Sequence, residues 1–172
     1  MKAVLLSIKP KYCELIASGK KTIEVRKSEP KLRTPFKCYI YCTKDFYRKG
    51  NGYFQGRSCG KVIGEFICDK IYDCDADSEG LFDKETKKHL PESCLDWKTI
   101  FLYTKGTLPL YGWQISDLII YDKPKELSEF TSCHINNDCK NCLQHSPLFH
   151  SKGRCLNYVK RPPQSWCYVE EL

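Results

Sequence analysis

The sequence contains no long hydrophobic run. Near its start, residues 4–8 are largely apolar, but Ser7 interrupts this stretch and Lys9 ends it. A membrane-spanning helix needs about 20 apolar residues, and the core of a secretory signal peptide needs about 7–15. We therefore expect a soluble, cytosolic protein with no membrane partner.

The sequence also lacks a visible internal repeat and has only 3 tryptophans in 172 residues. Its aromatic content comes mainly from 11 tyrosines, whose rings can pack in a core or stack on nucleobases. Hydrophobic residues make up 41% of the chain, which argues against general disorder. The length fits one domain with room for an insertion.

Cysteine, in contrast, is abundant. Twelve cysteines in a secreted chain would indicate a disulfide framework, but without an export signal we do not favour that interpretation. Cys38, Cys42 and Cys68 lie singly in apolar, strand-like runs, where a thiol acts as a small buried hydrophobic group.

The net charge of +7 is unevenly distributed along the chain. Residues 1–72 contain 16 Lys and Arg against 6 Asp and Glu, whereas residues 73–130 contain 7 against 12. A polarised surface of this kind favours a polyanionic partner. A well-solvated, lysine-rich surface is the alternative explanation.

Short strands outnumber helices in the sequence pattern. We expect a helix from Pro10 to Gly19, because proline suits a first helical position and glycine a helix end. A second helix is expected at about 94–103 with Ser93 as its cap, and a short helical piece at 125–130. The expected strands are residues 4–8, 21–26, 36–42, 61–72, 113–121 and 166–169. This pattern predicts an α+β fold, a small and mostly β barrel with helices packed on it.

Charged and apolar residues alternate in the strand expected at 21–26. Glu24 and Arg26 face one side of it, opposite the apolar residues. If this strand lies beside the first one, four charged side chains meet at one end of the barrel: Lys9, Lys21, Glu24 and Arg26. Inward-pointing charges need partners or water, so this arrangement predicts a cleft. A plain edge strand with a solvated face is the alternative.

The same region resembles the opening of the ASCH domain family, which has a PUA-like fold. The G-x-K-x-x-E-x-R signature of the family is matched by Gly19, Lys21, Glu24 and Arg26, directly after a strand and a helix. Residues 39–43, 60–65 and 112–115 fit later strands of the family. The ending at 162–166 resembles that of bacterial and phage-type members.

This resemblance implies a five- or six-stranded PUA-like β-barrel with a cleft beside the first helix. It implies a core of residues 1–130 and a final core strand within 161–172, separated by a Cys-rich insertion at 131–160. Family members are linked to RNA binding, and some resemble enzymes that act on RNA or on acylated nucleosides. Amidohydrolase-type members have a nucleophilic threonine where this chain has Glu24, and a carboxylate cannot replace that hydroxyl.

The leading hypothesis is a binding module for RNA or a nucleotide. Lys and Arg side chains would hold phosphate, Glu24 would accept from a base amino group, and Tyr41 or Trp113 would stack on a base. The predicted ligand-binding residues are Lys9, Lys21, Glu24, Arg26, Tyr41 and Trp113.

Two other hypotheses remain open. A ribonuclease or a hydrolase of modified nucleosides could use the same cleft, with Lys21 or Glu24 as the candidate base, although no histidine lies near the motif. An adaptor could instead dock a protein partner through its Cys-rich insertion.

A cysteine cluster near the C-terminus has the spacing of a metal site. Its pattern is C-x5-C-x2-C-x12-C, and the C-x2-C step brings two thiolates to one tetrahedral ion. Because the stretch has few apolar residues, a metal would offset the entropy cost of ordering it. We predict structural zinc; a metal-free loop and a redox pair at 139 and 142 are the alternatives. The predicted ligands are Cys133, Cys139, Cys142 and Cys155, with His134, His145, His150 or Cys167 able to replace one of them.

Elemental analysis of the purified full chain tests the zinc prediction. We expect about one equivalent of zinc, since four thiolate ligands complete a tetrahedral site. The Cys142→Ser substitution should lower the zinc content, whereas Cys68→Ser, outside the cluster, should not. Less than about a tenth of an equivalent in the unaltered protein would contradict the prediction.

Overall fold

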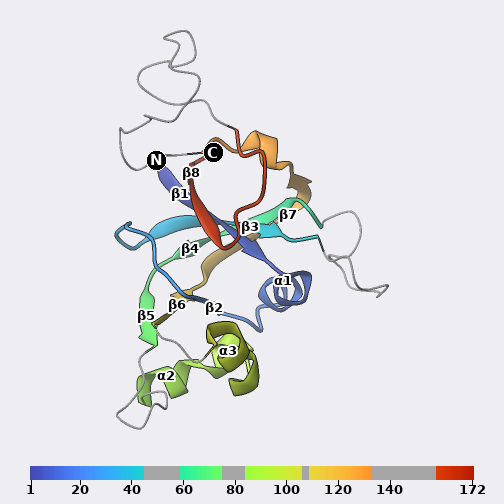
Figure 1. Cartoon of the computed structure of the whole chain (residues 1–172). Helices are drawn as coiled ribbons and strands as arrows, with labels where there is room; N and C mark the ends of the chain where they lie inside the picture. Colours follow the sequence, from blue (N-terminus) through green and yellow to red (C-terminus); the bar gives the residue numbers. More distant parts are fainter. Residues whose placement is uncertain (45–58, 75–83, 106–108, 133–157) are drawn as a thin grey trace.

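The computed structural model describes residues 1–44, 59–74, 84–105, 109–132 and 158–172. These residues form two β-sheets flanked by helices (Figure 1). No described helix is long and apolar enough to cross a membrane. The strands are β1 (Lys2–Ile8), β2 (Ile23–Arg26), β3 (Phe36–Cys42), β4 (Val62–Cys68), β5 (Ile71–Cys74), β6 (Leu110–Gln114), β7 (Ser116–Lys125) and β8 (Trp166–Glu170). The helices are α1 (Pro10–Ala17), α2 (Lys84–His89) and α3 (Trp97–Thr104), with short 3-10 turns η1 (Pro91–Ser93) and η2 (Leu127–Glu129).

The larger sheet has five strands in the order β7-β4-β3-β1-β8. Strands β1 and β3 are parallel, and the other neighbours are antiparallel. Because Lys2 pairs with Glu170, the two chain ends lie close together (Figure 1). The last strand of the chain thus belongs to the same sheet as the first.

The smaller sheet has three strands in the order β2-β6-β5. The described strands form two separate sheets, so their pairing does not close into the expected five- or six-stranded barrel. The first two strands are not neighbours either, since β1 pairs with β3 and β8 while β2 pairs with β6. The α+β class is as predicted.

Two predicted strands are each divided between the sheets. The expected strand at 61–72 consists of β4 in the larger sheet and β5 in the smaller one, with a break at Asp69 and Lys70. The expected strand at 113–121 is similarly divided at Ile115 into β6 and β7. At these breaks, the Gln114 N–H donates to the Lys70 carbonyl at 2.9 Å and the Ile115 N–H to the Thr22 carbonyl at 2.8 Å. At each of these two breaks the chain passes from one sheet to the other.

Helix α1 begins at Pro10 as predicted, but α3 begins later than expected. Asp96 caps α3, its carboxylate accepting from the Thr99 N–H at 2.6 Å. Ser93 belongs instead to the preceding 3-10 turn, where its hydroxyl donates to the Leu90 carbonyl at 2.6 Å. The prediction of Ser93 as the cap is therefore wrong, although serine and aspartate are both common N-cap residues.

The larger sheet has a hydrophobic core on each of its faces, and successive side chains of its central strands point to opposite cores. Val4, Leu6 and Ile8 of β1 face a core shared with α1. Leu5 and Tyr39 face a second core on the opposite side. A third, smaller cluster contains Ile23, Val25, Ile100 and Leu110, and it packs the three-stranded sheet against α3.

Strand β4 passes unusually close to β7 at Gly64. A Cβ atom placed there would collide with the Ile119 carbonyl oxygen, so only glycine lets the two backbones approach this closely. We expect Gly64→Ala to lower the free energy of unfolding by about 1–3 kcal/mol. Chemical denaturation measures this, with Lys2→Ala at an exposed site of β1 as the control. Equal stabilities of the two variants would contradict the interpretation.

Candidate functional site

The site begins where α1 ends, at a turn that requires glycine. Gly19 has a φ of +70°, a left-handed conformation that ends the helix. The Lys20 and Lys21 N–H groups donate to the Leu15 carbonyl at 2.9 and 3.0 Å, which folds the turn back onto α1. The chain then enters β2 with the Lys21 side chain directed into the protein, where it is 2% exposed.

The Lys21 ammonium group is surrounded by oxygen atoms. It donates to the Ile23 carbonyl at 2.7 Å and to the Ser93 carbonyl at 2.6 Å. Its third neighbour is Glu24 Oε2, at 3.3 Å. An ammonium group has three donors, so all of them are used inside the protein.

The Arg26 guanidinium group is also held on several sides. One terminal nitrogen contacts the carbonyl and hydroxyl oxygens of Ser165 at 3.2 and 3.3 Å. The other donates to the Ser7 carbonyl at 2.9 Å and contacts Glu24 Oε1 at 3.0 Å. The buried Nε has no hydrogen-bond partner in the structure. Arg26 thereby fastens β2 to the end of β1 and to the segment that precedes β8.

Glu24 lies between these two cations and completes a buried ion triad, Lys21–Glu24–Arg26. Each of its carboxylate oxygens faces one cation, and its side chain is 9% exposed. Burying charges is costly unless they are paired and hydrogen-bonded, and here both conditions hold. The alternation predicted for this strand is therefore present, but its charged face is buried rather than solvated.

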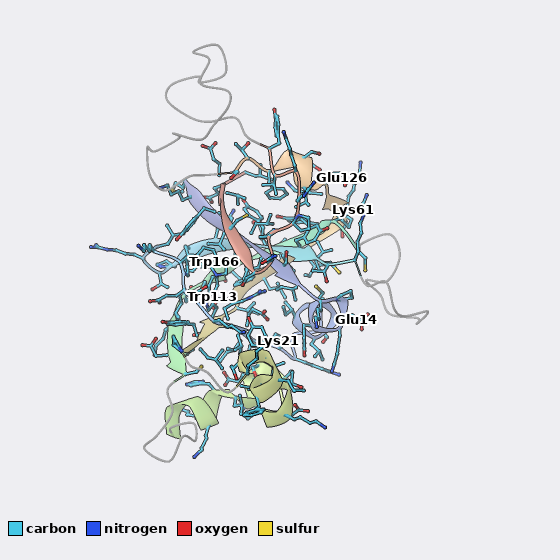
Figure 2. The ribbon with its side chains drawn as sticks, in the orientation of Figure 1. Glu14, Lys21, Lys61, Trp113, Glu126 and Trp166 are labelled. Carbon is cyan, nitrogen blue, oxygen red and sulfur yellow. The ribbon has the colours of Figure 1, made fainter. Side chains whose placement is uncertain are left out.

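A cleft of about 380 Å³ lies over the triad. Its size falls in the range of small-molecule sites in proteins. Figure 2 shows Lys21 near α3, one of the elements that form the cleft wall. The cleft is lined by Ser7, Ile8, Lys9, Tyr12, Lys21, Glu24, Val25, Arg26, Leu95, Thr99, Leu102 and Tyr103.

The ASCH domain family matches this sequence over residues 6–120. The chain belongs to the ASCH domain family. The matched region contains α1, the triad and the described strands from β2 to β6, so the resemblance seen in the sequence is confirmed. No curated protein sequence matches the chain.

Solved structures share the fold of this ASCH domain protein. An ASCH protein from Zymomonas mobilis has 20% identity and a TM-score of 0.60, with 98% of this chain and 88% of that chain covered. A serine-to-alanine variant of the Zymomonas protein has 18% identity and a TM-score of 0.61, with 98% and 89% covered. At this identity the likeness establishes the fold alone.

Four of the six predicted ligand-binding residues come together in this ASCH domain. Lys9, Lys21, Glu24 and Arg26 all line the cleft. They meet although β1 and β2 lie in different sheets, because Arg26 reaches across to Ser7 at the end of β1.

The two predicted stacking residues do not join them. Trp113 is 0% exposed and packs against Phe36 and Trp166, with ring centroids 5.8 and 6.0 Å away. Figure 2 labels Trp113 and Trp166 close to each other. Tyr41 is 3% exposed and belongs to the core on the other side of the larger sheet. Neither ring has a free face for a base. Their strand positions gave no means of separating core aromatic residues from cleft aromatic residues.

The cleft has other aromatic side chains that the sequence reasoning missed. Tyr12 of α1 and Tyr103 of α3 both line the cleft, and neither is among the predicted ligand-binding residues. Burial raises the pKa of Tyr12, and the negative charges of Glu24 and Asp96 raise it further. Burial also raises the pKa of Tyr103, more than Arg26 lowers it. Both phenols are therefore uncharged at neutral pH.

The predicted zinc ligands at 133–155, and the three nearby histidines, lie outside the described residues. Cys167, the alternative ligand, lies on β8 opposite Leu5, and burial raises its pKa to about 11. Among the residues that the structure describes, no cluster of His, Cys, Asp and Glu could hold a metal ion. The zinc site stays a prediction.

The triad predicts a difference between two adjacent lysines. Lys21→Met removes one partner of a buried ion network and leaves two carbonyl oxygens without their donor, so we expect it to cost about 3 kcal/mol of stability. Lys20→Met changes an exposed side chain of the same type and should cost less than about 0.5 kcal/mol. Thermal and chemical denaturation of both variants measure this difference. Equal stabilities would show that the buried triad does not support the fold.

Proposed function

We propose that this ASCH domain protein binds single-stranded RNA or a nucleotide in the cleft above the Lys21–Glu24–Arg26 triad. The observation that carries this proposal is the charge of the cleft wall, where three cationic side chains oppose one carboxylate. A concave basic site attracts a phosphate-bearing ligand. Its volume of about 380 Å³ suits a nucleotide.

The residues that line the cleft suit two kinds of contact with a ligand, one to phosphate and one to a base. Lys9 is exposed beside the buried triad, and its ammonium group suits a phosphate at the mouth. Tyr12, Tyr103 and Leu102 supply flat or apolar surface, and Leu102 is 67% exposed. Exposed apolar and aromatic groups beside basic ones are typical of single-strand binding, in which bases stack and phosphates are neutralised.

The hydrogen bonds of two of these cations support a role other than the predicted phosphate contact. Lys21 and the terminal nitrogens of Arg26 use their donors within the protein. They therefore contribute positive potential to the cleft rather than direct bonds to phosphate. A direct contact with phosphate would come from Lys9, the exposed lysine that lines the cleft.

The hydrolase alternative gains no specific support from the described residues of the cleft. Ser7 lines the cleft, and its hydroxyl group donates to the Pro163 carbonyl at 2.6 Å. This bond directs its proton to a backbone acceptor and not to a general base. The adaptor alternative depends on the insertion, most of which lies outside the described part of the chain.

Charge reversal at the rim tests the proposal. We expect Lys9→Glu to weaken binding of a fluorescent single-stranded RNA roughly tenfold at low salt, and to reduce the slope of log Kd against log salt by about 0.7. Lys123→Glu is the matched control, because this substitution changes the net charge by the same amount and Lys123 is exposed on β7 of the larger sheet. Fluorescence anisotropy over a salt series measures both variants.

Two outcomes would contradict this proposal. If the unaltered protein binds no RNA, the cleft is not an RNA site. If both variants lose the same affinity, the attraction comes from overall charge and not from the cleft. Gel electrophoresis of the RNA after incubation with the protein checks the hydrolase alternative, since shortened fragments would identify a nuclease.

A further inference from the structure

The floor of the cleft presents a hydrogen-bond acceptor, because the donors of its two cations are either used within the protein or buried. Lys21 has three donors and three oxygen neighbours. The two terminal nitrogens of Arg26 contact four oxygen atoms. The remaining guanidinium donor, on Nε, is buried away from solvent.

Glu24 differs from both cations in its unused capacity. Its two oxygens receive one cation each, at 3.3 Å from Lys21 and 3.0 Å from Arg26. A carboxylate has about four acceptor positions, so about two remain. Glu24 lines the cleft and keeps 9% of its side chain exposed. A ligand group that reaches the floor therefore meets an acceptor with two adjacent oxygens.

We propose that Glu24 selects guanine among the nucleobases. This inference rests on the proposed function, since it assigns the base that enters the same cleft. The guanine Watson–Crick edge carries two neighbouring donors, N1–H and the N2 amino group, spaced to meet two carboxylate oxygens. Adenine and cytosine offer one amino group beside a ring acceptor, and uracil offers one N–H between two carbonyl oxygens. Only guanine pairs both remaining positions of Glu24 without placing an acceptor against it.

The walls of the cleft fit a flat ring above this acceptor. Tyr12 and Tyr103 line it on the α1 and α3 sides, and Leu95 and Leu102 add apolar surface. Base–aromatic stacking is tolerant of sequence, so these residues provide affinity without choosing the base. Discrimination comes from Glu24, in a nearly dry position where an unpaired polar group is costly.

Changing the ligand tests this proposal without disturbing the buried triad. The experiment measures binding of guanosine 5′-monophosphate, inosine 5′-monophosphate and uridine 5′-monophosphate to the full chain by titration calorimetry. Inosine lacks only the N2 amino group, so we expect its Kd to be about tenfold higher than that of the guanine nucleotide. Uridine should bind more weakly still. The 1-methylguanosine nucleotide, which loses N1–H, should also bind about tenfold more weakly.

A protein variant provides an independent readout. Glu24→Gln replaces one acceptor oxygen by a donor, and it should remove the preference for guanine over inosine. Its folding is checked by thermal denaturation, because the substitution also leaves Lys21 and Arg26 without a negative partner. If the variant does not fold, the ligand series decides alone.

The results separate the two proposals. Equal affinity for the guanine and inosine nucleotides, together with RNA binding that depends on Lys9, would overturn guanine selection and leave the proposed function intact. Absence of binding by both the nucleotides and single-stranded RNA would overturn both. A guanine preference that persists in folded Glu24→Gln would show that another group reads the base.

Discussion

The buried ion triad Lys21–Glu24–Arg26 is the interaction on which the arrangement of this protein depends. Two cations and one carboxylate are removed from water, and such a group is tolerated only when every charge has partners. Those partners come from distant parts of the chain: Ser93 for Lys21, and Ser7 and Ser165 for Arg26. The triad thus joins the two sheets and the segment that precedes the last strand.

This constraint also shapes the cleft. Because the lysine and arginine donors are used internally, these cations affect the cleft through their electrostatic potential. The group with spare hydrogen-bonding capacity is the Glu24 carboxylate. The proposed function uses this character, since it combines attraction for a polyanion with recognition of a donor-bearing base edge. The tyrosines of α1 and α3 complete it with flat surface. Membership of the ASCH domain family agrees with a role of this class, since the family is linked to RNA binding.

Local patterns identified the elements well where each strand stays in one sheet. Strand β3 and the start of α1 match their predicted positions, because a short run of apolar and aromatic residues and an initial proline act over a few residues. The apolar runs at 61–72 and 113–121 were predicted as single strands, yet each divides between two sheets. The first crossing lies at the exposed pair Asp69-Lys70, and the second lies between Gln114 and Ser116. Polar residues also occur within single strands, as Glu65 does in β4, so these positions alone did not mark a change of sheet.

By itself, the sequence determined the ASCH motif, the alternation that places Glu24 and Arg26 on one face of β2, and the basic N-terminal part of the chain. It could do so because these are properties of neighbouring residues. Only the tertiary structure decided which aromatic side chains reach the cleft, burying Trp113 and Tyr41 and exposing Tyr103. It also decided which charged groups use their donors within the protein. Both depend on contacts between residues far apart in the chain, such as Arg26 with Ser165, and no local pattern encodes those distances.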